Sequence, residues 1–212
     1  MAGGTEATAR VLLDRCGRTY AAEAGIRLRD TPQPLYQLLV LSVLLSAPVR
    51  AGIAVSAARA LFAAGMRQPG RMAEARWQQR VDALGEGGYR RYDERTATML
   101  GEGAELLRER YRGDLRKLRG ADDVEQRLQE IPGLGPTGAR IFLREVQGVW
   151  PEYAPFFDAK AQSGAERVAL PTSPEELSRL AGSRENLPRL AAGLVRVALD
   201  KQAAEEVRSA AA

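Results

Sequence analysis

Two glycines that flank a single apolar residue form the most informative motif of this sequence. They lie in the segment Ile131-Pro132-Gly133-Leu134-Gly135, between two short stretches with helical periodicity. Gly133 and Gly135 can adopt backbone angles that other residues avoid, and Leu134 can pack between the flanking helices. Backbone N–H groups would then face outward at the positive end of the second helix, where anions bind. The pattern predicts a helix-hairpin-helix that holds DNA phosphates.

Contacts of this kind position DNA without selecting a base sequence. We expect them from residues of the turn and of the helix start that follows it: Pro132, Gly133, Leu134, Gly135, Thr137 and Gly138. The alternative is a plain helical hairpin in an all-α core, and Gly-x-Gly alone would not decide between the two. The full pattern of apolar residue, proline, glycine, apolar residue and glycine favours the DNA backbone.

Other kinds of chemistry are excluded by residues that the sequence lacks. It contains no histidine and one cysteine, Cys16. An intramolecular disulfide, a four-cysteine zinc or iron–sulfur site, a histidine metal site and a histidine-dependent catalytic triad are therefore impossible. Acid–base chemistry must rest on carboxylates, tyrosine, lysine or water. The formal net charge of +4 permits an anionic partner without requiring one.

Helical periodicity dominates the chain, and no run of alternating strand residues occurs. The pattern predicts an all-α fold, with Trp77 directed toward a core. The expected helices lie at about residues 4–16, 35–47, 51–63, 72–84, 92–112, 124–130, 136–147, 159–168, 174–181 and 187–208.

The sequence shows neither a secretory signal nor a membrane span. The apolar run 35–49 is interrupted by Gln37 and is too short to cross a bilayer, so we interpret it as a buried helix. We expect a monomer with no membrane partner, which acts in the cytoplasm in association with the nucleoid.

Beyond the hairpin, the chain resembles the endonuclease III-like superfamily of helix-hairpin-helix DNA glycosylases. The segment Pro34–Ala47, which ends in Leu-Leu-Ser-Ala, is similar to the early buried helix of the family. Residues 84–107 are similar to its next connection and long helix. The similarity extends over about residues 33–147 and is looser elsewhere.

This resemblance implies a two-lobed, all-α fold with double-stranded DNA across the cleft and a damaged base flipped into it. The implied domains are residues 33–147, and residues 1–32 together with 148–212. It also implies a monovalent cation, Na⁺ or K⁺, held by the main-chain carbonyls of Gln129, Ile131 and Leu134. The chain lacks the four cysteines of some relatives and resembles a branch without the iron–sulfur cluster.

The sequence departs from the family at both catalytic positions. Thr137 replaces the lysine of bifunctional members, and a hydroxyl cannot form their Schiff base, so we expect no efficient lyase activity. Lys160 is a weaker substitute. The catalytic aspartate matches Asp158, which lies a few residues late and could equally be a helix N-cap. Glu145 and Glu152 are weaker candidates.

Further DNA contacts are expected at Pro48, Arg50, Arg90 and Arg91, although a helix break and a solvated basic turn would explain these residues as well. Three hypotheses follow. The first is a monofunctional DNA glycosylase that hydrolyses an N-glycosidic bond in base-excision repair. The second is a catalytically inactive DNA-binding protein on the same scaffold. The third is a helical protein-interaction module with no nucleic-acid role.

Overall fold

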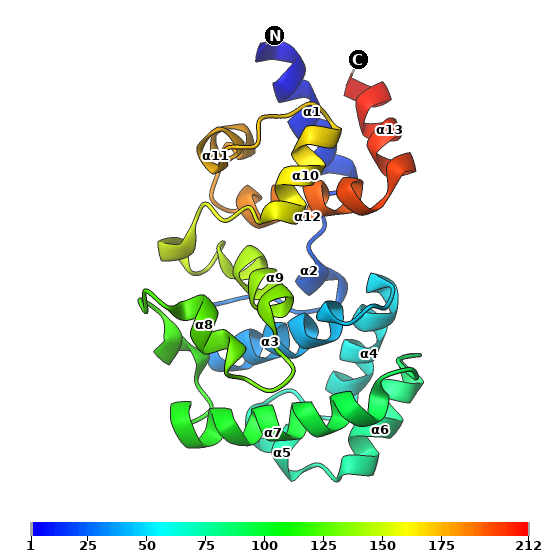
Figure 1. Cartoon of the computed structure of the whole chain (residues 1–212), viewed down its shortest axis with the longest axis vertical. Coiled ribbons are helices and arrows are strands. Elements are labelled where there is room, and N and C mark those ends of the chain that lie inside the picture. Colours follow the sequence, from blue (N-terminus) through cyan, green and yellow to red (C-terminus); the bar gives the residue numbers. More distant parts are fainter. Residues whose placement is uncertain (1, 212) are drawn as a thin grey trace. The chain divides into compact units, whose positions relative to one another are not determined.

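A computed structural model describes residues 2–211, and over this range the chain is all-α, which confirms the predicted fold class. Figure 1 shows helices joined by short connections. The α-helices are α1 (Ala2–Arg15), α2 (Tyr20–Glu23), α3 (Pro32–Ser46), α4 (Ala51–Ala63), α5 (Pro69–Glu74), α6 (Trp77–Glu86), α7 (Asp93–Tyr111), α8 (Val124–Gln129), α9 (Pro136–Val146), α10 (Ala159–Arg167), α11 (Pro174–Ala181), α12 (Asn186–Leu199) and α13 (Lys201–Ala211).

Two short 3-10 helices, η1 (Leu115–Leu118) and η2 (Pro151–Tyr153), complete the described elements. Neither they nor the four-residue α2 was predicted, because single turns carry too little periodicity to be seen in a sequence. Within the described residues, no helix has both the length and the apolar character needed to span a membrane.

The chain forms two compact units. Unit 1 comprises Met1–Tyr20 and Leu143–Ala212, and unit 2 comprises Ala21–Phe142. The sequence-based domains were residues 33–147 and the remainder. In the structure α2 after Tyr20 and the connection that follows it belong to unit 2, and the last turn of α9 belongs to unit 1.

Unit 2 is built on the predicted apolar helix, α3. Most of its residues are buried, and it packs on α4 and η1, while α7 packs on α5 and α6. Pro32 is the first helical residue, which is favourable because the first-turn N–H groups of a helix have no partner within it. The helix ends at Ser46, just before Ala47 and Pro48. This core supports the hairpin described below.

The single helix predicted at about 72–84 is wrong, because α5 ends at Glu74 and α6 begins at Trp77. The buried Arg80 side chain explains the break. Its guanidinium donates to the carbonyls of Met72 and Ala75 at 2.9 and 2.6 Å, and so satisfies acceptors that a continuous helix would have used. Trp77, expected in the core, is 42% exposed.

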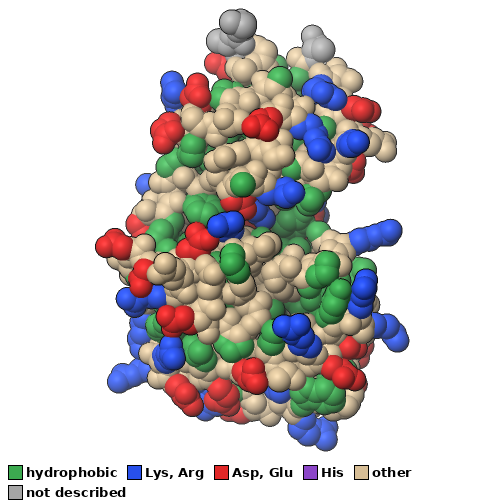
Figure 2. Space-filling view, in the orientation of Figure 1, with side chains coloured by type: hydrophobic (Ala, Val, Ile, Leu, Met, Phe, Trp, Pro, Cys, Tyr) green, Lys and Arg blue, Asp and Glu red, His purple; other side chains and the backbone are tan. Residues whose placement is uncertain are grey.

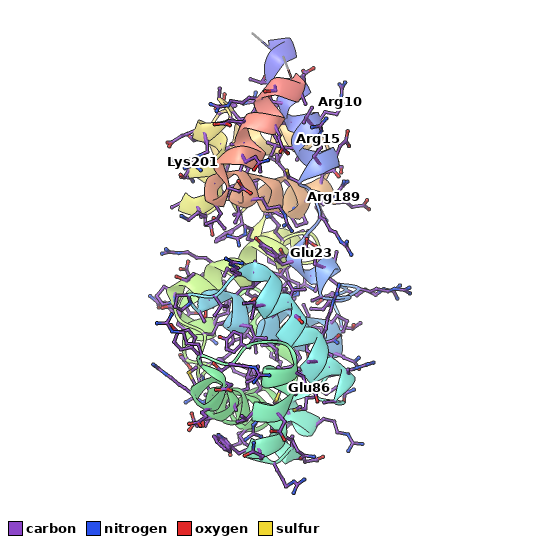
Figure 3. All side chains as sticks on the ribbon, turned by 90° about the vertical axis from the view of Figure 1, so that its right-hand side faces the viewer. Arg10, Arg15, Glu23, Glu86, Arg189 and Lys201 are labelled. Atoms are coloured by element: carbon purple, nitrogen blue, oxygen red, sulfur yellow. The ribbon has the colours of Figure 1, made fainter. Side chains whose placement is uncertain are left out.

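Unit 1 packs α10 against α12 and α1 against α12 and α13. Helices α10 and α12 approach closely at Gly164, where a Cβ atom would lie 1.9 Å from the carbonyl oxygen of Leu194. Arg189 of α12 donates to the carbonyl of Leu13 near the end of α1. Figure 3 shows the positions of Arg189 and of Arg15 in this unit.

The single helix predicted at about 187–208 is also wrong. Asp200 is extended, with φ −124° and ψ 114°, and it separates α12 from α13. Its carboxylate accepts the N–H groups of Gln202 and Ala203, so it begins the new helix as an N-cap.

Candidate nucleic-acid interface

The predicted helix-hairpin-helix is present. It consists of α8, a turn over residues 130–135, and α9. Leu128, Ile131 and Leu134 are buried, and Leu134 lies against Gly138 of α9. The Leu134 N–H donates to the Ile131 carbonyl at 2.9 Å and closes the turn. Apolar packing and this backbone hydrogen bond fix the turn, and Arg140 of α9 also donates to Glu125 Oε1 of α8 at 3.0 Å.

The two glycines of the motif differ in conformation. Gly133 has φ +85°, and a Cβ atom there would meet Val43 Cγ1 at 3.1 Å and Met99 Cβ at 3.2 Å. Gly135 has no positive φ and no neighbour within 4 Å of a Cβ position. The turn therefore needs glycine at Gly133 for its backbone and its packing, whereas Gly135 leaves open space at the surface.

Gly138, on the first turn of α9, serves the packing of the hairpin. A Cβ atom there would lie 2.8 Å from Leu134 Cδ1 and 3.4 Å from the Ser42 carbonyl oxygen. Glycine thus lets α9 approach α3 with Leu134 between them. Gly138 is buried, so it would not contact an anion directly. It would affect the predicted anion site only by allowing this packing.

A cavity of about 530 Å³ lies beside the turn, within unit 2. The hairpin forms one wall, the end of α3 forms another, and the start of α7 with the connection before it forms the third. The lining residues are Val43, Ser46, Ala47, Pro48, Tyr89, Tyr92, Arg95, Thr96, Met99, Gln129, Ile131, Pro132, Gly133, Leu134 and Gly135. No carboxylate lines this cavity. An anion beside the turn would therefore meet no like charge from the cavity wall.

One exposed arginine lines this cavity, and both basic and acidic residues lie next to its lining residues in the sequence. Arg95 lines it, and Arg50, Arg90 and Arg91 lie within two residues of lining positions. None of the four makes an ion pair with another described residue, unlike Arg110, Arg127 and Arg140 near the hairpin, which pair with glutamate or aspartate. Arg91 lies over the Tyr92 ring, 5.4 Å from its centroid. These guanidinium groups remain available for phosphates.

The sequence indicated part of this surface. Pro48 lines the cavity as part of the corner that follows α3. Tyr89, Arg95 and Met99 were missed, although Arg95 and Met99 are spaced i, i+4 on a predicted helix and so share a face. Only the fold shows that this face of α7 meets the hairpin. Thr137 is exposed on the first turn of α9.

The predicted cation ligands Gln129, Ile131 and Leu134 also line the cavity. The Ile131 carbonyl accepts a hydrogen bond from the Leu134 N–H. A carbonyl oxygen has two lone pairs, so this bond uses one of them. A set of neutral carbonyl oxygens suits a weakly held monovalent cation. Among residues 2–211, no group of three or more His, Cys, Asp and Glu side chains is placed to hold a metal ion.

Asp158, the candidate catalytic residue, lies in unit 1 as the N-cap of α10. Its Oδ1 accepts the Ala161 N–H at 3.0 Å, and its Oδ2 accepts from Arg144 Nη1 at 2.6 Å. The two side chains are only 9% and 5% exposed. Arg144 Nε is buried without a hydrogen-bond partner. The Asp158 side chain is therefore held by one arginine and by one backbone N–H group of α10.

The other candidate catalytic residues are either part of the packed interior or exposed at the surface. Glu145 is buried, and its Oε1 accepts the Tyr20 N–H at 3.0 Å. Gln147 is buried beside the pair and bridges the Arg144 carbonyl and both backbone groups of Phe156. This bridge orders the connection that carries Asp158. Lys160 and Glu152 are exposed.

No protein-family model matches the sequence, and no curated protein matches it. Among solved structures, the chain is similar to a trapped covalent intermediate of endonuclease III with DNA, an estranged-adenine complex. The two share 16% sequence identity, the similarity covers 90% of this chain and 84% of that chain, and the TM-score is 0.49. A likeness at this level says nothing about the chemistry of the present chain.

Proposed function

We propose that this protein binds double-stranded DNA through the hairpin of unit 2 and hydrolyses the N-glycosidic bond of a damaged or mispaired base. It would be a monofunctional DNA glycosylase of the endonuclease III-like superfamily. The observation that carries the DNA-binding part is the cavity beside the Gly133 turn, which is lined by the exposed, unpaired Arg95 and by no carboxylate. Such a surface favours a polyanion.

The distribution of charge supports the same conclusion. Acidic and basic residues are equal in number in unit 1, so the whole net charge of +4 belongs to unit 2. Binding to phosphates releases counterions, and the logarithm of the binding constant then falls by about 0.9 per contact for each tenfold rise in salt.

The test of DNA binding is the affinity for a labelled duplex between about 50 and 200 mM salt. Replacing Arg91 and Arg95 by glutamine should lower the salt slope by about 1.8, since two phosphate contacts are lost. A matched control replaces Arg179 and Arg184 of unit 1, which are also exposed. If the two double variants had equal effects, or if duplex binding did not depend on salt, the surface around the hairpin would not be the DNA-binding site.

For catalysis, we propose that the ionised Asp158 carboxylate stabilises the positive charge that develops on the sugar, or positions the attacking water. Thr137 cannot form an imine, so the reaction would end at an abasic site without β-elimination. The test is cleavage of duplexes with uracil, thymine glycol, 8-oxoguanine, mismatched adenine, hypoxanthine or alkylated purines. Strand breaks that need hot alkali support the proposal, and breaks without alkali contradict the role of Thr137 and redirect attention to Lys160.

The second candidate function is a catalytically inactive DNA-binding protein. The observation that favours it is the engagement of both Asp158 oxygens, one by Arg144 and one by the N-terminus of α10. A carboxylate held in this way resembles a structural cap as much as a catalyst. Duplex binding without breaks on any lesion, before or after alkali, would select this candidate.

The proposal also includes a monomer that acts in the cytoplasm on nucleoid DNA, and a Na⁺ or K⁺ ion at the carbonyls of Gln129, Ile131 and Leu134. Such an ion would stiffen the turn. The backbone N–H groups of the turn would then be held in place to bind phosphate. An iron–sulfur cluster has no ligands in a chain whose one cysteine is Cys16. Duplex affinity in potassium, sodium and tetramethylammonium salts at equal ionic strength tests the cation.

A further inference from the structure

A second cavity of unit 2, the α6–α7 groove, lies between α6 and α7 and has a volume of about 500 Å³. Its walls combine an aromatic ring, Trp77, with three carboxylates, Glu102, Glu105 and Glu109. None of these residues takes part in the proposed DNA interface. The groove therefore presents a chemistry that the proposed function does not use.

Trp77 forms one wall of the groove and is held in place. Its Nε1–H donates to Thr98 Oγ1 at 3.1 Å, so the ring is fixed to α7 while 42% of the residue stays exposed. Trp77 and Leu199 are the large apolar residues with the greatest exposure recorded in the described chain. An exposed, ordered tryptophan is typical of binding surfaces, because it offers a large contact area at little entropic cost.

The carboxylates share one face of α7, since Glu102, Glu105 and Glu109 are spaced i, i+3 and i+7. Glu105 pairs with Arg108 at 3.3 Å, whereas Glu102 and Glu109 make no ion pair with a described residue. Figure 2 shows acidic side chains gathered over α7. Two carboxylates beside an exposed indole favour a guanidinium or ammonium group, which can stack on the ring and pair with the acids.

Two cationic side chains of the groove are already engaged. The Arg80 guanidinium donates to the carbonyls of Ala97, Met72 and Ala75, and Arg110 pairs with Glu130 at 2.6 Å. Arg110 is thus paired with a carboxylate outside the groove, and the donors of Arg80 that these carbonyls accept are turned away from Glu102 and Glu109, although Arg80 keeps its positive charge. The acids stay available to a ligand of opposite charge.

Helix α7 separates this groove from the DNA surface. Arg95 and Met99 line the hairpin cavity, whereas Thr98 and Glu102 line the groove. On α7, one arginine and no carboxylate line the hairpin cavity, whereas three glutamates and one arginine line the groove. A polyanion on the hairpin would thus leave the groove free for another partner.

We propose that the α6–α7 groove docks a short basic segment of another protein, with an arginine or lysine over Trp77 and against Glu102 and Glu109. The segment is identified by charge complementarity and by the cation–π surface. This inference goes beyond DNA binding and does not depend on it. The groove recruits the partner, and the hairpin face holds the nucleic acid.

The experiment measures fluorescence anisotropy of a labelled, acetylated hexapeptide with arginine at the first, third, fourth and sixth positions and leucine at the others. The whole chain should bind this peptide and not a matched peptide with glutamate in place of arginine. Trp77→Ala should lower the affinity about tenfold, and Glu102→Gln with Glu109→Gln about fivefold. Leu199→Ala is the control for the exposed apolar residue, and Glu166→Gln with Glu205→Gln is the charge control.

Equal losses in the groove and control variants would overturn the proposal, because they would show unspecific charge attraction. Failure of the basic peptide to bind would overturn it as well. Concentration-dependent self-association that Trp77→Ala abolishes would identify a second copy of the chain as the occupant instead. Duplex affinity should stay unchanged in all groove variants, and a loss there would place the groove on the DNA face. Circular dichroism confirms that each variant is folded.

Discussion

Substituting alanine at each glycine of the hairpin in turn tests the structure most directly. Gly133→Ala and Gly135→Ala make the same chemical change two residues apart. The structure predicts different outcomes, because Gly133 has φ +85° and close neighbours, whereas a Cβ atom at Gly135 has none within 4 Å.

The magnitude follows from these contacts. A left-handed backbone costs an L-residue about 1–2 kcal/mol, and crowding of Val43 and Met99 adds about 1–3 kcal/mol. The lower entropy of the unfolded alanine chain offsets about 0.4–1 kcal/mol. We expect Gly133→Ala to lower the free energy of unfolding by about 3 kcal/mol. Gly135→Ala should leave it within about 1 kcal/mol of the parent value.

DNA affinity should reveal an effect of Gly135→Ala that stability does not. At Gly135 the added methyl group projects into open space on the surface that phosphate would approach, so Gly135→Ala should weaken duplex binding while the chain remains as stable as the parent. Urea unfolding followed by circular dichroism gives the stability, and anisotropy of a labelled duplex gives the affinity. Equal loss of stability in both variants would refute the assignment of backbone strain to Gly133 alone.

Three further predictions concern buried polar groups and close packing. Asp158→Asn should lower the free energy of unfolding by about 3–5 kcal/mol because it leaves a buried cation unpaired, and adding Arg144→Met should restore most of it in the same urea assay. Gly101→Ala should cost about 1–3 kcal/mol, seen as a lower melting temperature, because its Cβ would lie 2.7 Å from Arg80 Nη2; an unchanged value would contradict that packing. Burial raises the pKa of Tyr36, so the folded chain keeps a proton that the unfolded chain releases, and stability should fall as pH rises past about 10. Tyr36→Phe should flatten this dependence above about pH 10 in the same urea assay, and an unchanged dependence would contradict the assignment.

Helix content and the hairpin were predictable because both are local. The apolar run from Leu35 and the Gly133–Gly135 motif specify a buried helix and a tight turn through backbone preferences and periodicity. The two broken helices were not predictable. The break after Glu74 depends on Arg80, whose guanidinium reaches carbonyls five and eight residues back in the chain, and helical periodicity continues across it.

In the candidate site, too, the sequence indicated some residues, whereas only the fold shows which of them lie together. The sequence indicated Pro48, Arg50, Arg90 and Arg91 as separate possibilities, each with an ordinary structural explanation. Only the packing of α7 against the hairpin brings Arg95 to the cavity wall beside Pro48 and the turn. That proximity depends on contacts between segments far apart in the chain, which no local pattern specifies.

The sequence by itself determined that this chain is helical, that it carries a Gly-x-Gly turn between two helices, and that histidine and multi-cysteine chemistry are absent from it. The tertiary structure decided that Gly133 rather than Gly135 needs its glycine, that Asp158 is paired with Arg144, and that Trp77 is exposed. The reason is physical. Backbone propensity and side-chain chemistry belong to each residue, whereas burial, pairing and steric room are properties of the neighbours that folding supplies.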